Sequence, residues 1–302
     1  MKSATDYADR ESALDFIGQL YPHAGSTVII DHGYDNIVII VDESYAVRFP
    51  RNTKAYLRNV YETIVLSKLQ SITNPVLPVP LDSYLSPLAF VNRYVPGRHL
   101  NVDEIVSLPL SKKTELAEDF CNFVVDFQSR LSEKDIASAK EAAGLGDVQE
   151  EPWPDYFKRM ISGKPFQSTD RQRVADSSYA KWMELVDVNN RQTVVHDDLH
   201  VGNLLFDNDN RLSGVLDFGL CDVGTVEQEF RQLARISEEL LNIASEKYIK
   251  ITGRPVDLEA AKLWAIMQDL AAYNKYVDGE GNPPGLVRAR YYLNKWFPDV
   301  NW

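Results

Sequence analysis

Three residues with a distinctive spacing stand out in the second half of the chain. Asp198 is followed five residues later by Asn203, and Asp217 comes fourteen residues after Asn203. Phosphoryl transfer needs one carboxylate to orient the attacking hydroxyl, and an amide oxygen with a second carboxylate to hold Mg²⁺ against the phosphates. Apolar residues on both sides of the turn at 207–210 predict a hairpin with Asn203 and Asp217 close together at its open end. The spacing therefore predicts a phosphoryl-transfer site.

The two segments also resemble a known family. His196, Asp198 and Asn203 fit the pattern H-x-D-x-x-x-x-N, and the run beginning at Asp217 reads D-F-G. This combination resembles the catalytic loop of the aminoglycoside phosphotransferase family, which shares the protein-kinase fold. The resemblance implies that Asp198 is the catalytic base and that Asn203 and Asp217 bind Mg²⁺, with ATP or GTP as co-substrate. His196 is expected to support the loop rather than take part in the chemistry.

The resemblance implies a phosphate-binding region in the N-terminal part. Gly33 lies between the first two expected strands, where kinases place a flap over the phosphates, although an ordinary hairpin turn fits equally well. Arg48 stands where kinases have a Lys that reaches the α- and β-phosphates. Arg keeps the positive charge and can bind phosphate with two parallel hydrogen bonds. Its carboxylate partner is expected to be Glu62, on the following helix.

A purine site is expected at the hinge that the resemblance implies at residues 92–95. Backbone groups there, including those of Asn92 and Tyr94, would hydrogen-bond the purine. Phe90 would lie at the back of the pocket, where a large side chain can influence the choice between ATP and GTP.

The sequence gives weaker evidence for the acceptor site than for the catalytic residues. In the family the acceptor lies against the helical lobe, and cationic aminoglycosides are bound by carboxylates. The resemblance therefore points to a cationic small molecule, with four acidic candidates: Asp197, Asp222, Glu238 and Glu239. Acidic residues on helices are also commonly no more than solvated surface groups. After the D-F-G segment the chain lacks the acids that relatives often have, and Glu229 is expected to replace the Asp that anchors this segment.

The predicted elements place these residues in two lobes. Three β-rich runs within residues 27–49, a helix over 54–70 and a strand over 88–94 predict an antiparallel N-terminal lobe. Helical spacing dominates after Pro96-Gly97. It covers 111–132, 153–161 and 178–186, a weak helix or loop over 133–150, and C-terminal helices, one of them carrying Phe230, Leu233, Ile236 and Leu240. The class is α+β, a bilobal protein-kinase-like fold, with an N-lobe over 1–95 and a C-lobe over 96–302.

The amino-acid composition limits the classes of partner that the chain can bind. The 302 residues include 32 basic and 44 acidic side chains, a net charge of −12, which argues against a broad nucleic-acid-binding face. No apolar run approaches the roughly 20 residues needed to cross a bilayer, and the first residues lack the apolar core of a signal peptide. A cytoplasmic protein with free thiols at Cys121 and Cys221 is expected, without nucleic-acid or membrane partners and with a monomer favoured.

The leading hypothesis is an ATP- or GTP-dependent O-phosphotransferase that modifies a hydroxyl of an aminoglycoside antibiotic and so confers resistance. One alternative is a kinase of the same fold for another alcohol, such as a macrolide, a sugar, a choline-like alcohol or an amino-acid hydroxyl. A catalytically silent nucleotide-binding protein is disfavoured by the intact Asp198, Asn203 and Asp217. A protein kinase is disfavoured by the missing Gly-rich repeat and the short stretch available for an activation loop.

Overall fold

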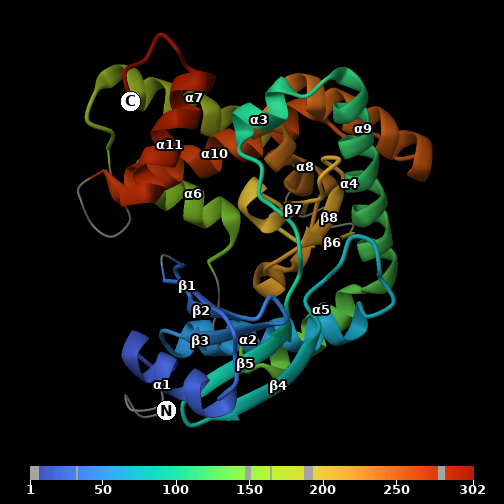
Figure 1. Ribbon diagram of the computed structural model, residues 1–302. Coiled ribbons are helices and arrows are strands. Elements are labelled where there is room, and N and C mark those ends of the chain that lie inside the picture. The colour runs from blue at the N-terminus through green and yellow to red at the C-terminus, as the bar shows by residue number, and fades with distance from the viewer. Residues whose placement is uncertain (1–6, 32, 147–150, 164, 187–192, 278–282) are drawn as a thin grey trace. The chain divides into compact units, whose positions relative to one another are not determined.

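The computed structural model describes the chain except for residues 1–6, 32, 147–150, 164, 187–192 and 278–282. It separates into two compact units, each assembled from segments that are distant in sequence (Figure 1). Unit 1 contains Met1–Asn101, Asn122–Gln149 and Asp198–Asp222; unit 2 contains Val102–Cys121, Glu150–Asp197 and Val223–Trp302. The boundary expected between residues 95 and 96 stays a prediction. Asp198, Asn203 and Asp217 belong to the same unit as the N-terminal sheet.

Unit 1 is built on a five-stranded antiparallel sheet in the order β1-β2-β3-β5-β4. Its strands are β1 (Thr27–Ile30), β2 (Asn36–Val41), β3 (Tyr45–Pro50), β4 (Pro80–Leu85) and β5 (Leu88–Arg93). Strand β4 was not predicted from the sequence, because its first residue is the last of several prolines and only a few of its residues are apolar. Proline is tolerated there because it occupies the first position of an edge strand.

Alternation along the strands gives the sheet two different faces. Val47 and Phe49 of β3 are fully buried in an apolar cluster with residues of β2 and β5. Helix α1 (Arg10–Leu20) covers this face, with the rings of Phe16 and Phe49 6.0 Å apart. Arg48, between them in sequence, faces the opposite side and pairs across the ladder with Phe90. The two faces thus separate an apolar core from the predicted nucleotide residues.

The remaining parts of unit 1 carry the candidate site. They are helix α2 (Thr53–Lys68), the last residues of α4 (Leu110–Arg130), α5 (Glu133–Ala142), the hairpin of β7 (Leu204–Phe206) and β8 (Leu212–Val215), and a 3₁₀ turn at Phe218–Leu220. Helix α2 begins at the N-cap Asn52, whose side chain accepts a hydrogen bond from the Ala55 amide at 2.9 Å. Helix α5 begins with a capping box of Ser132 and Asp135, so the first part of the expected loop or weak helix is a helix; residues 147–150 of that stretch lie outside the described residues.

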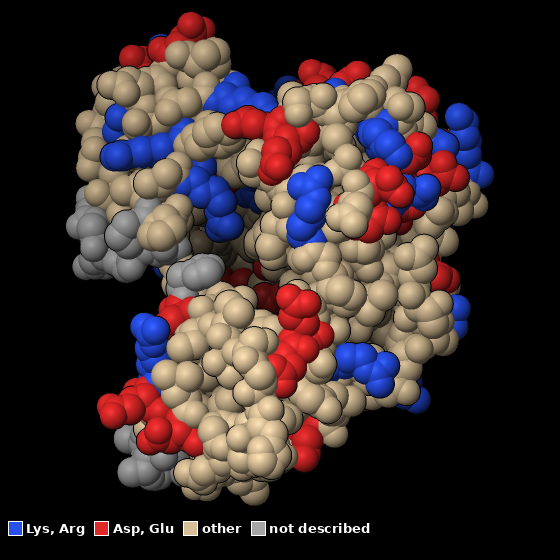
Figure 2. All heavy atoms as spheres, in the orientation of Figure 1, with Lys and Arg blue, Asp and Glu red and all other residues tan. Residues whose placement is uncertain are grey.

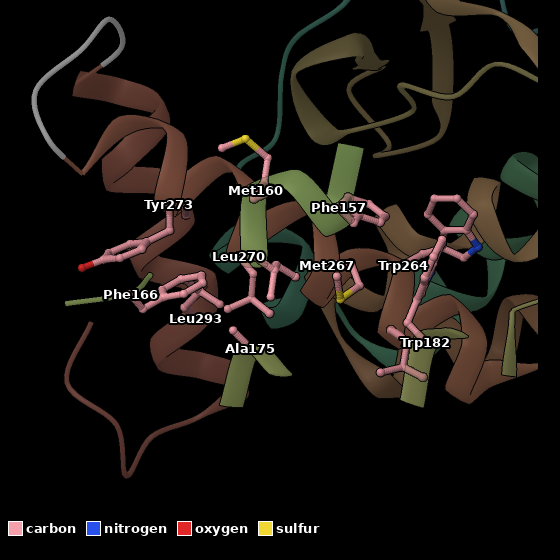
Figure 3. Packing of buried hydrophobic residues seen from close by; sticks show 14 of the residues in the cluster. Phe157, Met160, Phe166, Ala175, Trp182, Trp264, Met267, Leu270, Tyr273 and Leu293 are labelled. Carbon is pink, nitrogen blue, oxygen red and sulfur yellow. The ribbon is translucent and has the colours of Figure 1, made fainter. Parts of the chain in front are cut away.

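Unit 2 is mainly helical. Its elements are α3 (Val102–Ser107), the first turns of α4, α6 (Trp153–Ser162), α7 (Thr169–Leu185), β6 (Thr193–Val195), most of β9 (Asp222–Gly224), α8 (Val226–Ile236), α9 (Glu238–Thr252), α10 (Leu258–Tyr276) and α11 (Pro283–Trp296). A large aromatic core joins α6, α7, α10 and α11 (Figure 3). Within it the rings of Trp182 and Trp264 meet edge to face at 5.2 Å.

One helix expected from the sequence is in fact two. Phe230, Leu233 and Ile236 lie on α8, whereas Leu240 lies on α9. Ser237 separates the two helices because its side chain accepts a hydrogen bond from the Leu240 amide at 3.0 Å and so caps α9. Among the helices that the structure describes, none combines the length and the apolar composition needed to cross a lipid bilayer.

Candidate active site

The hairpin of β7 and β8 brings Asn203 and Asp217 to the same end, as their spacing predicts. Leu204 pairs with Val215, and the Leu216 amide donates a hydrogen bond of 2.9 Å to the Asn203 carbonyl. At the other end, Asp207 accepts hydrogen bonds through Oδ1 from the Asp209 and Arg211 amides and closes the turn. Asn203 is thus next to the residue that precedes Asp217.

Asp217 adopts a left-handed conformation, with φ 64° and ψ 71°. This region is uncommon for a residue other than glycine. The following residue, Phe218, is fully buried and packs against Phe123 and Phe127, with ring centroids 6.4 and 6.1 Å away. The buried phenylalanine anchors the segment, while the Asp217 side chain stays exposed. A strained residue beside a firm anchor is consistent with a functional carboxylate.

Asp198 is tied to Asn203 by two hydrogen bonds. The Asn203 Nδ2 donates to the Asp198 carbonyl at 2.9 Å and to its carboxylate Oδ2 at 3.1 Å. The His200 Nε2 lies 3.7 Å from the same Oδ2. Asp198 is half-buried, and with Asn203 and Asp217 it forms a set of polar groups gathered from two sequence segments.

An ion pair joins β3 to α2 within the same unit. The Arg48 guanidinium contacts Glu62 Oε2, and only 16% and 2% of the two side chains are exposed. The other oxygen, Glu62 Oε1, accepts a hydrogen bond from the Phe218 amide at 3.2 Å. Glu62 therefore connects the expected phosphate-binding arginine to the segment that contains Asp217. The pairing of Arg48 with Glu62 that the resemblance implies is present in the structure.

Charge and burial act together on this pair. Burial raises the pKa of Glu62, Arg48 opposes that shift, and the nearby Asp217 carboxylate adds to it. Burial by itself would lower the pKa of Arg48, but the carboxylates of Glu62 and Asp217 outweigh it and raise that pKa. Arg48 is therefore firmly positive beside a region of negative potential.

The donor set fits Mg²⁺ of the kind that nucleotides bring with them. Asn203 turns its Nδ2 toward Asp198, which leaves its Oδ1 for a cation. Outside the ranges that the structure leaves undescribed, no group of three or more His, Cys, Asp or Glu residues could hold a metal ion alone. Mg²⁺ in nucleotide sites commonly takes one or two protein oxygens, with phosphates and waters completing the shell. Asn203 and Asp217 suit that arrangement.

The expected purine and flap residues lie on or beside the sheet. Phe90 is buried, and its ring lies 5.8 Å from that of Tyr56 on α2. The amides of Arg93 and Tyr94 donate to the carbonyls of Val79 and Ser44, so these two donors are already used within the protein. Asn92 is buried in β5.

In the loop that precedes β2, the Gly33 carbonyl accepts a hydrogen bond of 3.1 Å from Arg51 Nε. Gly33 is exposed. The loop around it is thus held to the end of β3.

The four acidic acceptor candidates all have basic partners. Asp222 pairs with Lys140 at 2.8 Å and Glu239 with Lys113 at 2.6 Å, and Glu238 pairs with Lys262. Asp197 is different because its pair with Arg231, at 2.7 Å, is nearly enclosed, with 11% and 2% of the side chains exposed. Acidic and basic groups are likewise interspersed on the face shown in Figure 2. None of the four stands as an isolated carboxylate.

Helix α8 contacts the loop just before Asp198. Glu229 Oε2 accepts a hydrogen bond of 2.5 Å from the His196 amide, so it contacts the segment before Asp198, whereas its expected role was to anchor the segment after D-F-G. Arg231 and Gln228 were not predicted as partners of Asp197, which sits at φ 66°. The sequence signal was weak: only an Arg and a Gln at buried helical positions, where an apolar residue is usual.

The family comparison covers most of the chain. The model of the phosphotransferase enzyme family, APH, matches residues 26–270. A curated relative, the uncharacterized protein YcbJ of Bacillus subtilis strain 168, is 21% identical over 198 residues, which are 58% of this chain and 61% of the relative. That alignment therefore spans about three-fifths of the relative's length.

Solved structures share the fold at low sequence identity. The GDP and kanamycin complex of APH(2″)-IIIa has a TM-score of 0.78 at 15% identity, covering 95% of this chain and 99% of the other. The streptomycin–ATP–APH(2″)-IIa ternary complex has a TM-score of 0.66 at 18% identity, covering 98% and 97%. Macrolide 2′-phosphotransferase MphH from Brachybacterium faecium also has a TM-score of 0.66 at 18% identity, covering 94% and 98%. These likenesses establish a protein-kinase-like fold.

Proposed function

Since this chain belongs to the phosphotransferase enzyme family, we propose that it transfers the γ-phosphoryl group of ATP or GTP to a hydroxyl of an aminoglycoside antibiotic and thereby confers resistance. The observation that carries this proposal is the linked set of Asp198, Asn203 and Asp217 in one compact unit with the Arg48–Glu62 pair. Structures similar to this chain are described with GDP, with ATP and with aminoglycosides.

Each residue of the set has a role that its chemistry suits. Asp198 would orient the acceptor hydroxyl and take its proton, with positioning contributing more than base strength because the transition state is loose. Mg²⁺ bound by Asn203 and Asp217 would neutralise charge on the phosphates. Arg48, fixed by Glu62, would bind the α- and β-phosphates through its planar guanidinium. His200, near the Asp198 carboxylate, would help hold its orientation.

A second acceptor class is favoured by the ion pairs. A polycationic drug would have to compete with Lys140, Lys262 or Lys113 for the carboxylates predicted to bind it. Exposed pairs of this kind are weak, so competition is feasible, but the local negative potential is reduced. The buried pair of Asp197 with Arg231 offers much less access. A less cationic hydroxyl compound, such as a macrolide, is therefore the second candidate.

An acceptor screen tests the proposal. Purified protein is incubated with Mg²⁺ and with either ATP or GTP, and nucleoside diphosphate release is measured against panels of aminoglycosides, macrolides, sugars and choline-like alcohols. We expect release to rise only with an aminoglycoside, with one phosphate added to the drug by mass spectrometry. Stimulation by a macrolide alone would favour the second candidate, and no stimulation by any antibiotic would reject the antibiotic assignment.

A further inference from the structure

Arg58 of α2 lies among the residues of the candidate active site, yet the sequence analysis gave it no role. Its Nη1 forms an ion pair of 2.8 Å with Asp35 Oδ2, at the end of the loop that contains Gly33. Its backbone also borders the D-F-G segment. A Cβ built on Gly219 would lie 3.7 Å from Arg58 Cβ and 3.5 Å from Asp217 Oδ1. Arg58 therefore pairs with the residue at the end of the loop and lies against Gly219, two residues after the predicted metal ligand Asp217.

The carboxylates near Arg58 outnumber the arginines, so an additional cation facing the phosphates would favour their binding. The carboxylates of the cluster include Asp35, Glu62, Asp198 and Asp217, and its guanidinium groups include those of Arg48 and Arg58. Arg51, beside the same loop, is paired with Asp31. Arg48 is already paired with the buried Glu62. A nucleoside triphosphate is a polyanion, and the Mg²⁺ bound with it offsets only part of its charge, so a cation in addition to Arg48 would favour binding of its terminal phosphates. Arg58 is a second arginine in this cluster.

The ion pair of Arg58 with Asp35 is partly exposed and can open. The side chains of Arg58 and Asp35 are 21% and 35% exposed, and partly exposed ion pairs contribute little to stability. A guanidinium binds phosphate through charge-assisted, often bidentate, hydrogen bonds that are stronger than a solvated ion pair. A triphosphate could therefore replace Asp35 as the partner of Arg58.

We propose that Arg58 forms the binding site for the γ-phosphate, and that Asp35 holds this arginine until a triphosphate displaces it. The inference rests on the proposed nucleotide site of unit 1 and extends it. Arg58 thereby distinguishes a triphosphate from a diphosphate. Asp35 acts as a competitor of the nucleotide for this guanidinium.

Two substitutions test this by opposite effects. Calorimetry with Mg²⁺ measures the binding of ADP and of a non-hydrolysable ATP analogue to the full chain. For Arg58→Gln we expect the analogue to bind about 10-fold more weakly or worse, which matches the loss of one charged hydrogen bond, with ADP affinity nearly unchanged. For Asp35→Asn we expect the analogue to bind more tightly than in the wild type, because the competing carboxylate has gone.

Two matched control variants distinguish γ-phosphate binding by Arg58 from other causes of a change in nucleotide affinity. Lys68→Gln removes the same charge further along α2, and Asp31→Asn removes a loop carboxylate that pairs with Arg51; neither should change the ratio of the two affinities. Equal weakening of both nucleotides in Arg58→Gln, or weaker analogue binding in Asp35→Asn, would show that the pair only ties the loop to α2 and would overturn the inference. Should Arg58→Gln fail to fold, Asp35→Asn decides alone. A wild-type chain that binds neither nucleotide would reject the nucleotide site itself.

Discussion

Two buried arginine–carboxylate pairs, Arg48–Glu62 of unit 1 and Arg235–Asp269 of unit 2, differ in their surroundings. In unit 2, Arg235 contacts Asp269 at 2.7 Å, the other Asp269 oxygen accepts a hydrogen bond of 3.1 Å from Trp296, and the Tyr292 ring lies 5.6 Å from the guanidinium. In unit 1, the second oxygen of Glu62 instead bonds the Phe218 amide, next to the exposed Asp217. Burial raises the pKa of both Asp269 and Glu62.

The contrast shows what separates a structural pair from one in a candidate active site. Residue types, burial and the direction of the carboxyl pKa are shared, so none of them is diagnostic alone. The pair in unit 2 is closed off by aromatic side chains of α11. The pair in unit 1 adjoins an exposed acid in a strained conformation, which a structural role would not require. Activity should therefore depend on unit 1's charges, and stability mainly on those of unit 2.

The largest effect is expected at Asp198. Asp198→Ala should lower kcat by about 10³-fold, since a positioned base contributes on that scale. Nucleotide affinity should change little because the Arg48–Glu62 pair is retained. Steady-state kinetics together with ADP calorimetry measure both quantities. Near wild-type turnover would mean that the chemistry does not depend on the unit 1 cluster. It would contradict the conclusion that activity depends on the charges of unit 1.

Substitutions of Arg235 and Arg48 should have different effects, the first mainly on stability and the second mainly on nucleotide binding. Arg235→Met leaves Asp269 buried without its cation, so we expect a loss of about 3–5 kcal/mol in the free energy of unfolding. The nucleotide KM of the folded fraction should stay near that of the wild type. Arg48→Met should instead raise the KM for ATP or GTP. Urea unfolding and kinetics on both variants check this, and an unchanged nucleotide KM in Arg48→Met would show that Arg48 does not face phosphate.

A pH effect is expected from unit 2. Burial raises the pKa of Glu229 from 4.5 to about 8, against the opposing effect of Arg231. The folded state therefore holds this proton more tightly than the unfolded state, and the stability it confers is complete below about pH 4.5 and lost as the pH rises toward 8. Gln at this position keeps an oxygen that can accept the His196 hydrogen bond. Unfolding free energies between pH 5 and 8 should fall less steeply in Glu229→Gln than in the wild type; equal slopes would rule this explanation out.

The smallest effect is expected at Glu238. Its pair with Lys262 lies on the surface, where ion pairs contribute little. Glu238→Gln should leave thermal stability unchanged and should alter the acceptor KM by less than about twofold, because this carboxylate is already paired with Lys262. A rise in KM for a cationic drug alone, at unchanged kcat, would instead place that drug at Glu238 and favour the aminoglycoside candidate over the macrolide candidate.

The sequence predicted the elements and contacts that follow from local pattern. The hairpin joining Asn203 to Asp217 depends on short apolar strands and a polar turn, and both are visible in the sequence. The pair of Arg48 with Glu62 was expected from the resemblance to the aminoglycoside phosphotransferase family, which implies a basic residue on the third strand and a Glu on the next helix. The roles of these residues in binding nucleotide and metal stay predictions.

Contacts between buried polar groups were missed for a physical reason. Arg231 reaches Asp197 across 34 residues of sequence, and periodicity records apolar faces rather than which charged groups meet. Ser237, which ends one helix and caps the next, was hidden because the apolar spacing continues through it. The ion pair of Arg58 with Asp35 was missed because neither residue stands at a position that the family pattern names.

The central claim is that Asn203 and Asp217 hold Mg²⁺ against the phosphates of a bound nucleotide. Calorimetric titration of a non-hydrolysable ATP analogue, with and without Mg²⁺, tests it most directly in the wild type and in Asp217→Asn. We expect Mg²⁺ to tighten binding to the wild type by at least about 10-fold and to have little effect on the variant. An equal Mg²⁺ dependence in both proteins, or none in the wild type, would contradict the claim.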